Sequence, residues 1–290
     1  MKTMILLSHE FSFQLCKVKI LGNKGFSTAT LSLKYLQHRF TAGYRNGFGI
    51  HSPYLYDLVR NVIFNQQKQA VPDYVQQLHS RLKKDRQILE LNEIGAGSRV
   101  TQAGKRTVSS IARGSSVTSK QGALLFRICK WYAPSVILEF GTGLGISTAY
   151  LAAGSGGAPV ITVEGCKTKH LFAVGNMIPE LAPKIEFLEG DFTIHFSSML
   201  KKVEERALVF IDGDHRYLPT MDKVTACLKK ENIKEVMLIL DDIYWSKEME
   251  KAWDDCISME MADISLDLFH FGLLIKRGGI ARQHFKIKFQ

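Results

Sequence analysis

Acidic side chains directly follow two apolar runs in the second half of the chain. FIDGDHRY places Asp212 after the first run, and LILDDIYW places Asp241 and Asp242 after the second. Neighbouring carboxylates at the end of a buried strand repel one another and need protons or a cation. These three would offer hard oxygen ligands, which suit Mg²⁺ or Ca²⁺ better than a transition metal. The alternative is that the acids cap helices or form ion pairs with Lys247 and Arg216.

A glycine-rich loop joins the apolar run 136–140 to a helix-compatible segment, 146–153. Its acidic, hydroxyl and glycine positions are Glu139, Gly141, Thr142, Gly143, Gly145 and Ser147. Glycine lets a ligand approach the backbone closely, and the free N–H groups of a helix N-terminus point at that ligand. A dinucleotide fingerprint would require glycine at position 146, where Ile146 stands. The loop therefore predicts a site for a polar cofactor and disfavours NAD.

Two further acids stand where strands of an open sheet would end. Glu164 ends VITVEG, 19 residues after Gly145, and a carboxylate there can accept both hydroxyls of a ribose. Asp191 follows the next predicted strand, in GDF. Since NAD enzymes share the ribose-binding acid, Glu164 indicates a nucleoside without selecting the cofactor. Both acids could instead cap the helices that follow them.

The apolar periodicity predicts an α/β fold. Five strands are expected at 136–140, 160–163, 185–188, 207–211 and 236–240, with helices between them. Such alternation predicts a doubly wound, mostly parallel sheet. The runs 264–268 and 271–275 are separated by only two residues, so they can pair only as an antiparallel hairpin. Ligands are then expected beyond the carboxyl ends of the parallel strands, where the acids and the glycine loop would meet.

The first part of the chain has a different pattern. Residues 1–34 give no clear period and are expected to be poorly ordered. A helix is expected from Ser52-Pro53 to about residue 65, and another over 73–89. The Gly- and Ser-rich span 92–119, which contains GAGSR, is expected to be an irregular lid over the site. Residues 35–119 would thus form a helical extension, and residues 120–290 the α/β domain.

The ordered motifs resemble those of class I S-adenosylmethionine (AdoMet)-dependent methyltransferases, in particular the catechol O-methyltransferase-like group and its bacterial members with IDGDH. From about residue 116 onward the agreement covers K-x-G, E-x-G-x-G-x-G, Glu164, Asp191, IDGDH and LDDIYW. The resemblance implies a Rossmann-like class I methyltransferase domain over 120–290. It also implies that AdoMet contacts Glu139, Gly141, Thr142, Gly143, Gly145, Ser147, Glu164, Asp191 and Asp212.

The resemblance further implies O-methylation of a hydroxyl on a small molecule. In metal-dependent members, the acid ending strand four and the acidic pair ending strand five hold the metal, here Asp212, Asp241 and Asp242. Mg²⁺ would lower the pKa of the hydroxyl and orient it. A lysine often stands three residues after the strand-four acid, whereas this chain has His215. We therefore predict Asp212 and His215 as catalytic residues, with His215 as the base.

Three other functions stay open at this stage. The first is a nucleic-acid or protein methyltransferase that uses the basic N-terminal half. Residues 1–134 carry 20 Lys and Arg against 6 Asp and Glu, whereas residues 135–290 carry 18 against 22. The cations are scattered, which favours a solvated surface over a nucleic-acid platform. The others are an NAD-dependent oxidoreductase and a non-catalytic AdoMet-binding protein.

Composition predicts a cytoplasmic protein. No apolar run approaches the roughly 20 residues of a membrane span. The N-terminal apolar stretch is too short for a signal peptide, although residues 24–45 would also suit a transit peptide. The cysteines are odd in number and far apart, at Cys16, Cys129, Cys166, Cys227 and Cys256. We read them as reduced thiols rather than as disulfides or a zinc site, and expect a monomer or homodimer.

Overall fold

The computed structural model describes residues 25–43, 49–64, 70–91, 104–203, 205–231, 233–259 and 261–289. The predictions for residues 1–24 and for the GAGSR segment, 95–99, lie outside this range. None of the described helices is both long and apolar enough to span a membrane.

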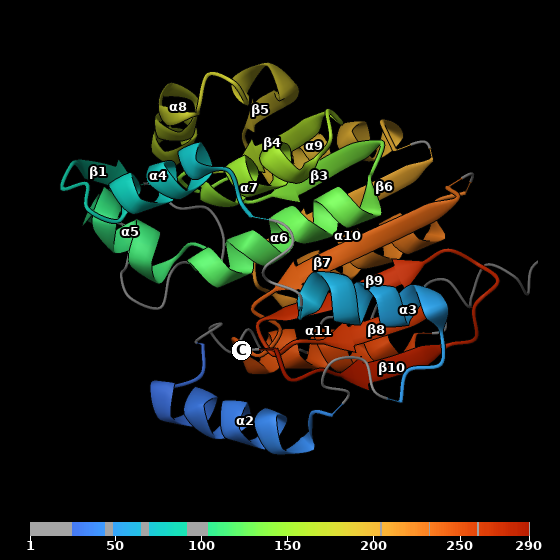
Figure 1. Ribbon diagram of the computed structural model, residues 1–290. Coiled ribbons are helices and arrows are strands. Elements are labelled where there is room, and N and C mark those ends of the chain that lie inside the picture. Colours follow the sequence, from blue (N-terminus) through green and yellow to red (C-terminus); the bar gives the residue numbers. More distant parts are fainter. Residues whose placement is uncertain are drawn as a thin grey trace, which may run out of the picture.

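An eight-stranded sheet forms the centre of the molecule, in the order β10-β8-β9-β7-β6-β3-β4-β5 (Figure 1). The bounds of its strands are β3 Val136–Phe140, β4 Val160–Glu164, β5 Ile185–Glu189, β6 Arg206–Ile211, β7 Glu235–Asp241, β8 Ile264–Asp267, β9 Phe271–Lys276 and β10 Gln283–Lys286. The pairs β3–β4, β3–β6, β4–β5, β6–β7 and β8–β10 are parallel, whereas β9 is antiparallel to β7 and β8. The predicted Rossmann-like, mostly parallel sheet with a C-terminal antiparallel hairpin is confirmed.

Helices cover both faces of this sheet, as Figure 1 shows. On one face lie α6 (Ser119–Tyr132), α7 (Ile146–Gly154) and α8 (Lys167–Asn176), and on the other α9 (Phe192–Lys201), α10 (Tyr217–Lys229) and α11 (Lys247–Ser258). Successive strand residues point to opposite faces, so Ile137 joins the first apolar core and Leu138 the second. Because the central strands are buried on both faces, they are largely apolar.

The segment before α6 differs in part from its prediction. The first helix begins at Pro53 as expected, with Ser52 as its cap, but it is α3 (Pro53–Asp57) followed by a π-helix, η3 (Leu58–Ile63). The second, α4 (Asp73–Leu82), ends seven residues early, and β1 (Ile88–Leu91) follows. The predicted helix 73–89 included Leu89. Leu89 and Leu91 are instead buried at the two-residue period of a strand.

The irregular span predicted up to residue 119 is wrong over its second half. Strand β2 (Gly104–Thr107) pairs antiparallel with β1, and helix α5 (Val108–Gly114) follows. The sequence GKRT hid this strand because its buried residue is an arginine. The Arg106 guanidinium donates to the Ser110 carbonyl and the Ser115 hydroxyl. Strand β10 was missed for a similar reason, since QHFK contains one apolar residue, Phe285.

An N-terminal helix, α2 (Thr28–Thr41), is fixed to the hairpin end of the sheet by a buried ion pair. His38 Nε2 lies 3.0 Å from Asp267 Oδ1, with side-chain exposures of 4% and 0%. The Tyr244 hydroxyl donates to Asp267 Oδ2 at 2.7 Å, and the Phe269 N–H donates to Oδ1 at 2.9 Å. Burial alone would raise the pKa of Asp267, but these partners bring it below its ordinary value.

Loss of the imidazole should therefore destabilise the fold strongly. We expect His38→Ala to lower the free energy of unfolding by about 3–5 kcal/mol at pH 7, because it leaves a buried carboxylate without its partner. The Asp267 contribution is present above its unfolded pKa of about 3.9 and is lost as pH falls through the lower folded value. Urea unfolding at pH 7 measures the change.

A second ion pair on the same helix provides a control. Lys34 and Glu250 lie 2.6 Å apart but keep side-chain exposures of 23% and 28%. Lys34→Ala should cost no more than about 1 kcal/mol. Equal costs for the two variants would mean that the buried pair does not anchor α2.

Candidate active site

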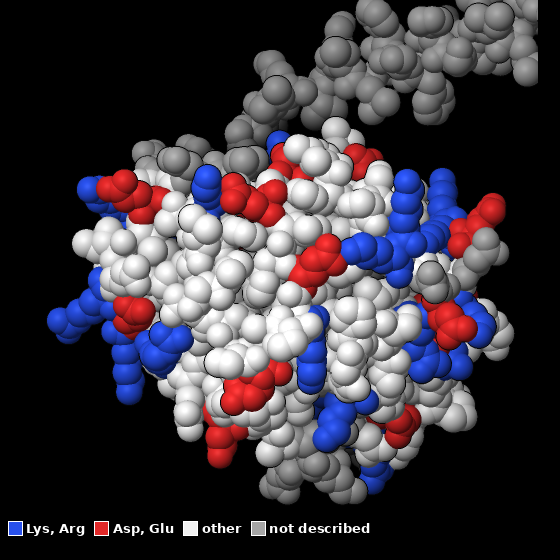
Figure 2. Space-filling model, turned by 90° about the horizontal axis from the view of Figure 1, so that it is seen from above, with Lys and Arg blue, Asp and Glu red and all other residues white. Residues whose placement is uncertain are grey.

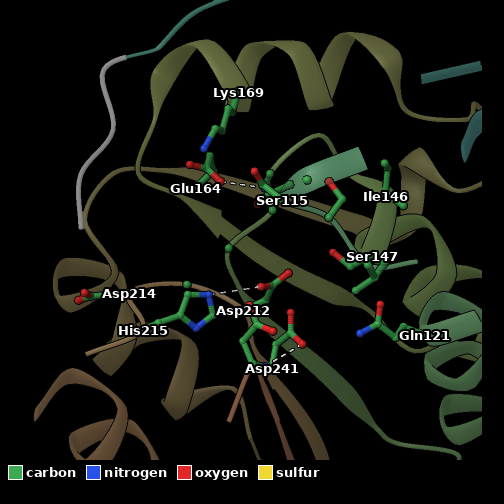
Figure 3. A pocket seen from close by; sticks show the side chains of 18 of the residues that line it. Ser115, Gln121, Ile146, Ser147, Glu164, Lys169, Asp212, Asp214, His215 and Asp241 are labelled. Atoms are coloured by element: carbon green, nitrogen blue, oxygen red, sulfur yellow. Dashed lines mark hydrogen bonds and ion pairs between the residues drawn. The ribbon is translucent and has the colours of Figure 1, made fainter. Parts of the chain in front are cut away.

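A cavity of about 380 Å³ opens at the carboxyl ends of β3, β4, β6 and β7 (Figure 3). It collects most of the predicted site residues: Gly141, Thr142, Gly143, Ser147, Glu164, Asp212, His215, Asp241 and Asp242 all line it. Glu164 lies at one end, whereas Asp212, Asp241 and His215 lie together at the other (Figure 3). One end can thus hold a nucleoside, and the other can take part in proton or cation chemistry.

The glycine loop turns sharply between β3 and α7. Gly141, Gly143 and Gly145 have φ angles of +108°, +57° and +80°, which side chains rarely adopt. A Cβ on Gly141 would lie 2.2 Å from the carbonyl oxygen of Asp212. The Asp212 N–H also donates to the Phe140 carbonyl at 2.8 Å. The loop is therefore pressed against the turn that carries Asp212, which brings the two ends of the cavity together.

Glu164 is held in place by two backbone donors. The Gly143 N–H donates to its Oε2 at 2.8 Å, and the Cys166 N–H donates to its Oε1 at 2.9 Å. The carboxylate is nearly buried yet lines the cavity. Its remaining lone pairs can accept hydrogen bonds from a ligand such as a ribose.

Glu139 occupies a different position, beneath the loop. It is fully buried and is not among the cavity-lining residues, and burial raises its pKa. The Thr148 and Thr162 hydroxyls both donate to Oε2, at 2.5 Å and 2.7 Å, whereas Oε1 has no hydrogen-bond partner among the described residues. Glu139 thus supports the loop and, through Thr148, the start of α7. Ser147, the residue before Thr148, faces the cavity.

The acidic end is formed by the strand ends of β6 and β7. Burial raises the pKa of both Asp212 and Asp241 well above the ordinary value. The next cause is the charge of Asp241 for Asp212, and the charge of Asp242 for Asp241. His215 Nε2 lies 3.9 Å from Asp212 Oδ1, and its ring is 5.8 Å from that of Trp245. With both pKa values raised, this end of the cavity favours carboxyl groups that hold a proton or face a cation.

These acids do not form a complete metal site in this arrangement. Among the described residues, no three Asp, Glu, His or Cys side chains converge in a geometry that could hold a metal ion. Asp242 contributes its backbone N–H, at 2.9 Å, to Asp241 Oδ1. The chemistry of two buried carboxyls still fits a hard divalent cation, because positive charge would offset the burial of both groups.

Asp191 lies at the end of β5 but outside the cavity lining. Its Oδ1 accepts the N–H of Thr193 at 2.7 Å and the hydroxyl of the same residue at 2.5 Å, so it caps α9. Phe192, the next residue, lines the cavity instead. The carboxylate of Asp214 pairs with the Arg216 guanidinium, so this acid of IDGDH is occupied by its neighbour.

Several lining residues had no motif to indicate them. Arg113 and Ser115 come from the end of α5, Gln121 from α6, Lys169 from α8 and His270 from the β8–β9 turn. Lys169 extends toward Glu164 (Figure 3). His270 could have been placed from the hairpin prediction alone, because an antiparallel return begins at the edge where its neighbour ends.

Comparison with known proteins agrees with this geometry. Residues 138–243 match the model of a family described as a methyltransferase domain. The match lies within the α/β part of the chain, which is similar there to a methyltransferase domain. The matched segment contains the glycine loop, Glu164 and all three acids of the acidic end. No curated protein matches the sequence at a significant level.

Several solved structures are similar to this chain at low sequence identity. The S-adenosylhomocysteine-bound methyltransferase PaMTH1 of Podospora anserina is 12% identical with a TM-score of 0.53, over 87% of this chain and 97% of that one. The O-methyltransferase of Bacillus cereus, also in complex with S-adenosylhomocysteine, is 19% identical with a TM-score of 0.47, over 56% of this chain and 82% of that one. At these identities the likeness concerns the fold.

The contact between Gly141 and Asp212 can be tested by a pair of alanine variants. Gly141→Ala should destabilise the methyltransferase domain by about 3 kcal/mol or more, because it combines a strained φ with a steric clash. Gly143→Ala, which meets nothing within 4 Å and has an αL φ, should cost only about 1–2 kcal/mol. Urea unfolding compares them, and equal losses would contradict the close approach as the cause.

Proposed function

We propose that this methyltransferase uses AdoMet and transfers its methyl group to a hydroxyl of a small molecule. The observation that carries the proposal is the division of one cavity into two ends. Glu164 and the glycine loop offer hydrogen bonds suited to a nucleoside, and the acids with His215 face them across the cavity. The solved relatives support the cofactor, since the Bacillus cereus O-methyltransferase and PaMTH1 are both described with S-adenosylhomocysteine.

In this proposal the cofactor spans the cavity from Glu164 to the glycine loop. Glu164 accepts the ribose hydroxyls, while Gly141, Thr142 and Gly143 surround the methionine part. Ser147 faces the same part from the first turn of α7. Gly145 is not among the cavity-lining residues, so its contact with the cofactor remains a prediction. Glu139 acts through the loop that it supports. Contacts from Asp191 to the adenine and from Asp212 to the cofactor remain predictions.

The methyl transfer is an in-line displacement. An oxygen of the acceptor attacks the methyl carbon, the carbon–sulfur bond of the sulfonium breaks, and neutral S-adenosylhomocysteine leaves. The hydroxyl proton passes to the imidazole of His215. Alignment of the two reactants supplies up to ~7–11 kcal/mol of the rate enhancement. His215 is held for this role between Asp212 and the ring of Trp245.

A divalent cation fits the same end of the cavity. Bound to Asp212 and Asp241, with Asp242 as the third predicted ligand, Mg²⁺ would lower the pKa of the acceptor hydroxyl. Asp212, Asp241 and Asp242 all line this end of the cavity. Without a cation, the raised pKa values of Asp212 and Asp241 favour protonated carboxyl groups.

A small acceptor is favoured over nucleic acid because several basic residues of the N-terminal half contact other groups of the protein. Arg106 is buried and donates to Ser110 and Ser115, and Lys34 and Lys105 form ion pairs with Glu250 and Glu90. Part of the positive charge of the N-terminal half is therefore engaged within the protein. On the face seen in Figure 2, cations and anions are interspersed rather than gathered in one basic area. A cytoplasmic location and a homodimer stay predictions.

Titration with S-adenosylhomocysteine tests the cofactor. Calorimetry should show micromolar binding of this ligand and no comparable binding of NAD⁺. Glu164→Gln should weaken binding about tenfold or more, because it removes a charged acceptor that contacts both the loop and the ribose. Glu189→Gln, an exposed acid at the end of the neighbouring strand β5, serves as the matched control. Equal binding of NAD⁺, or no binding by the folded protein, would refute the proposal.

The role of the acidic pair can be tested separately through stability. The folded pKa values of Asp212 and Asp241 are raised, so the metal-free protein binds extra protons and loses stability as pH rises above about 4. Asp241→Asn should therefore raise the free energy of unfolding at pH 8 by at least about 1 kcal/mol, and the gain should vanish near pH 4.

The same measurement includes Mg²⁺. Mg²⁺ should stabilise the wild-type protein at pH 8 and leave Asp241→Asn unchanged, because a ligand of the folded state adds stability by mass action. Equal responses of the two proteins would exclude Asp241 as a ligand. In that case, methyl transfer would depend on His215 without a metal.

A further inference from the structure

A second cavity, of about 320 Å³, lies between α4, α6 and α7. It is distinct from the active-site cavity, and the two share no lining residue. Helix α6 separates them, since Thr118 and Gln121 face the active site whereas Ser119 and Lys120 face the second cavity. Its other polar lining residues include Ser80, Arg127 and Tyr150.

Arg127 is the unusual member of this lining. Its residue exposure is 3%, and its Nε donates to the Val62 carbonyl at 2.7 Å. Among the described residues, no carboxylate lies within 4 Å of its guanidinium. An arginine stays charged in a protein, and buried charges are normally paired. The burial of Arg127 beside a cavity therefore leaves a positive charge that lacks a counter-charge from the described chain.

The rest of the lining points to the same kind of ligand. The first turn of α6, a 14-residue helix, contributes Ser119 and Lys120, and helix N-termini carry partial positive charge. The hydroxyls of Ser80, Ser119 and Tyr150 can each donate a hydrogen bond. No Asp or Glu is present among the described residues that line the cavity. Two cations, several donors and no acid form an environment suited to an anion and unsuited to a metal ion.

We propose that this cavity binds an oxyanion, namely the phosphoryl group of a small molecule or free phosphate. The guanidinium of Arg127 would donate to two phosphoryl oxygens, with Lys120 and the first turn of α6 completing the site. Ala70, Val71 and Ala123 form an apolar part of the wall, where a small organic group attached to the phosphate can lie. The site is independent of the proposed methyl transfer.

The second cavity lies against α6 and α7, two helices that also line the active-site cavity. Tyr150 lies one turn after Ser147 on α7, and its hydroxyl is 3.0 Å from His79 Nδ1 of α4. A bound oxyanion would thus contact α6 and α7, which also contribute Gln121 and Ser147 to the active-site cavity.

Thermal unfolding of the full chain tests the site. Inorganic phosphate and phenyl phosphate are titrated at constant ionic strength, with chloride as the reference anion, and saturable stabilisation gives an apparent affinity. We expect both ligands to stabilise the wild-type protein. Tighter binding of phenyl phosphate would identify a phosphorylated molecule as the occupant, and equal or weaker binding would identify free phosphate.

Two lysines of α6 provide matched variants. Both are exposed, but Lys120 lines the cavity whereas Lys130 does not. Lys120→Gln should weaken phosphate binding about fivefold or more, and Lys130→Gln should leave it unchanged. Arg127→Met should abolish it, and the lysine pair keeps the test decisive if this buried variant does not fold. No saturable effect in the wild-type protein, or equal affinities of the two lysine variants, would overturn the proposal.

Discussion

The close approach of Gly141 to the carbonyl of Asp212 is the contact on which the active site depends. Two strand ends, those of β3 and β6, can lie this near only because one of them lacks a side chain. The contact places the cofactor loop beside the turn that carries the acidic end. Substrate and cofactor groups that meet in this cavity are therefore aligned by backbone packing, before any side chain takes part.

Buried charge is handled in three ways in this protein, and each indicates a different role. Asp267 is paired with His38 and serves to fix a helix. The pKa values of Asp212 and Asp241 are raised by burial and by neighbouring acids, so these groups would respond to a ligand that brings positive charge. Arg127 has no carboxylate within 4 Å among the described residues and lines the second cavity, which is the basis of the proposed anion site. Function follows from which of these charges the chain has left uncompensated.

Much of the fold could be predicted from the sequence because the central strands are buried on both faces. Such strands are largely apolar runs, interrupted by Glu139 in β3 and Thr162 in β4, so β3, β4, β6 and β7 are recognised without tertiary information. The strands β2 and β10 could not be found, since one is built around the polar Arg106 and the other pairs at the sheet edge. Their positions depend on pairing with β1 and β8, which their own residue types do not indicate.

The candidate site could also be predicted only in part. Residues at the ends of recognisable strands, such as Glu164 and Asp212, could be placed because parallel strands deliver their carboxyl ends to one edge. The direction of each side chain could not. Glu139 and Asp191 are adjacent to the predicted site, yet one supports the loop from below and the other caps α9. Both side-chain directions follow from hydrogen bonds with nearby residues, Thr148 for Glu139 and Thr193 for Asp191.

The antiparallel strand β9 has a consequence for how acceptor preference can diverge. Phe271, at its beginning, pairs with Asp241 at the end of β7, so the short turn before β9 lies at the cavity edge, and its His270 carbonyl accepts the Asp242 N–H. Glu164 lies at the opposite end of the cavity. Insertions or exchanges in a two-strand hairpin can therefore remodel one wall of the cavity while the wall around Glu164 is left unchanged. The antiparallel strand β9 thus allows the hairpin wall of the cavity to change independently of the wall formed by the glycine loop.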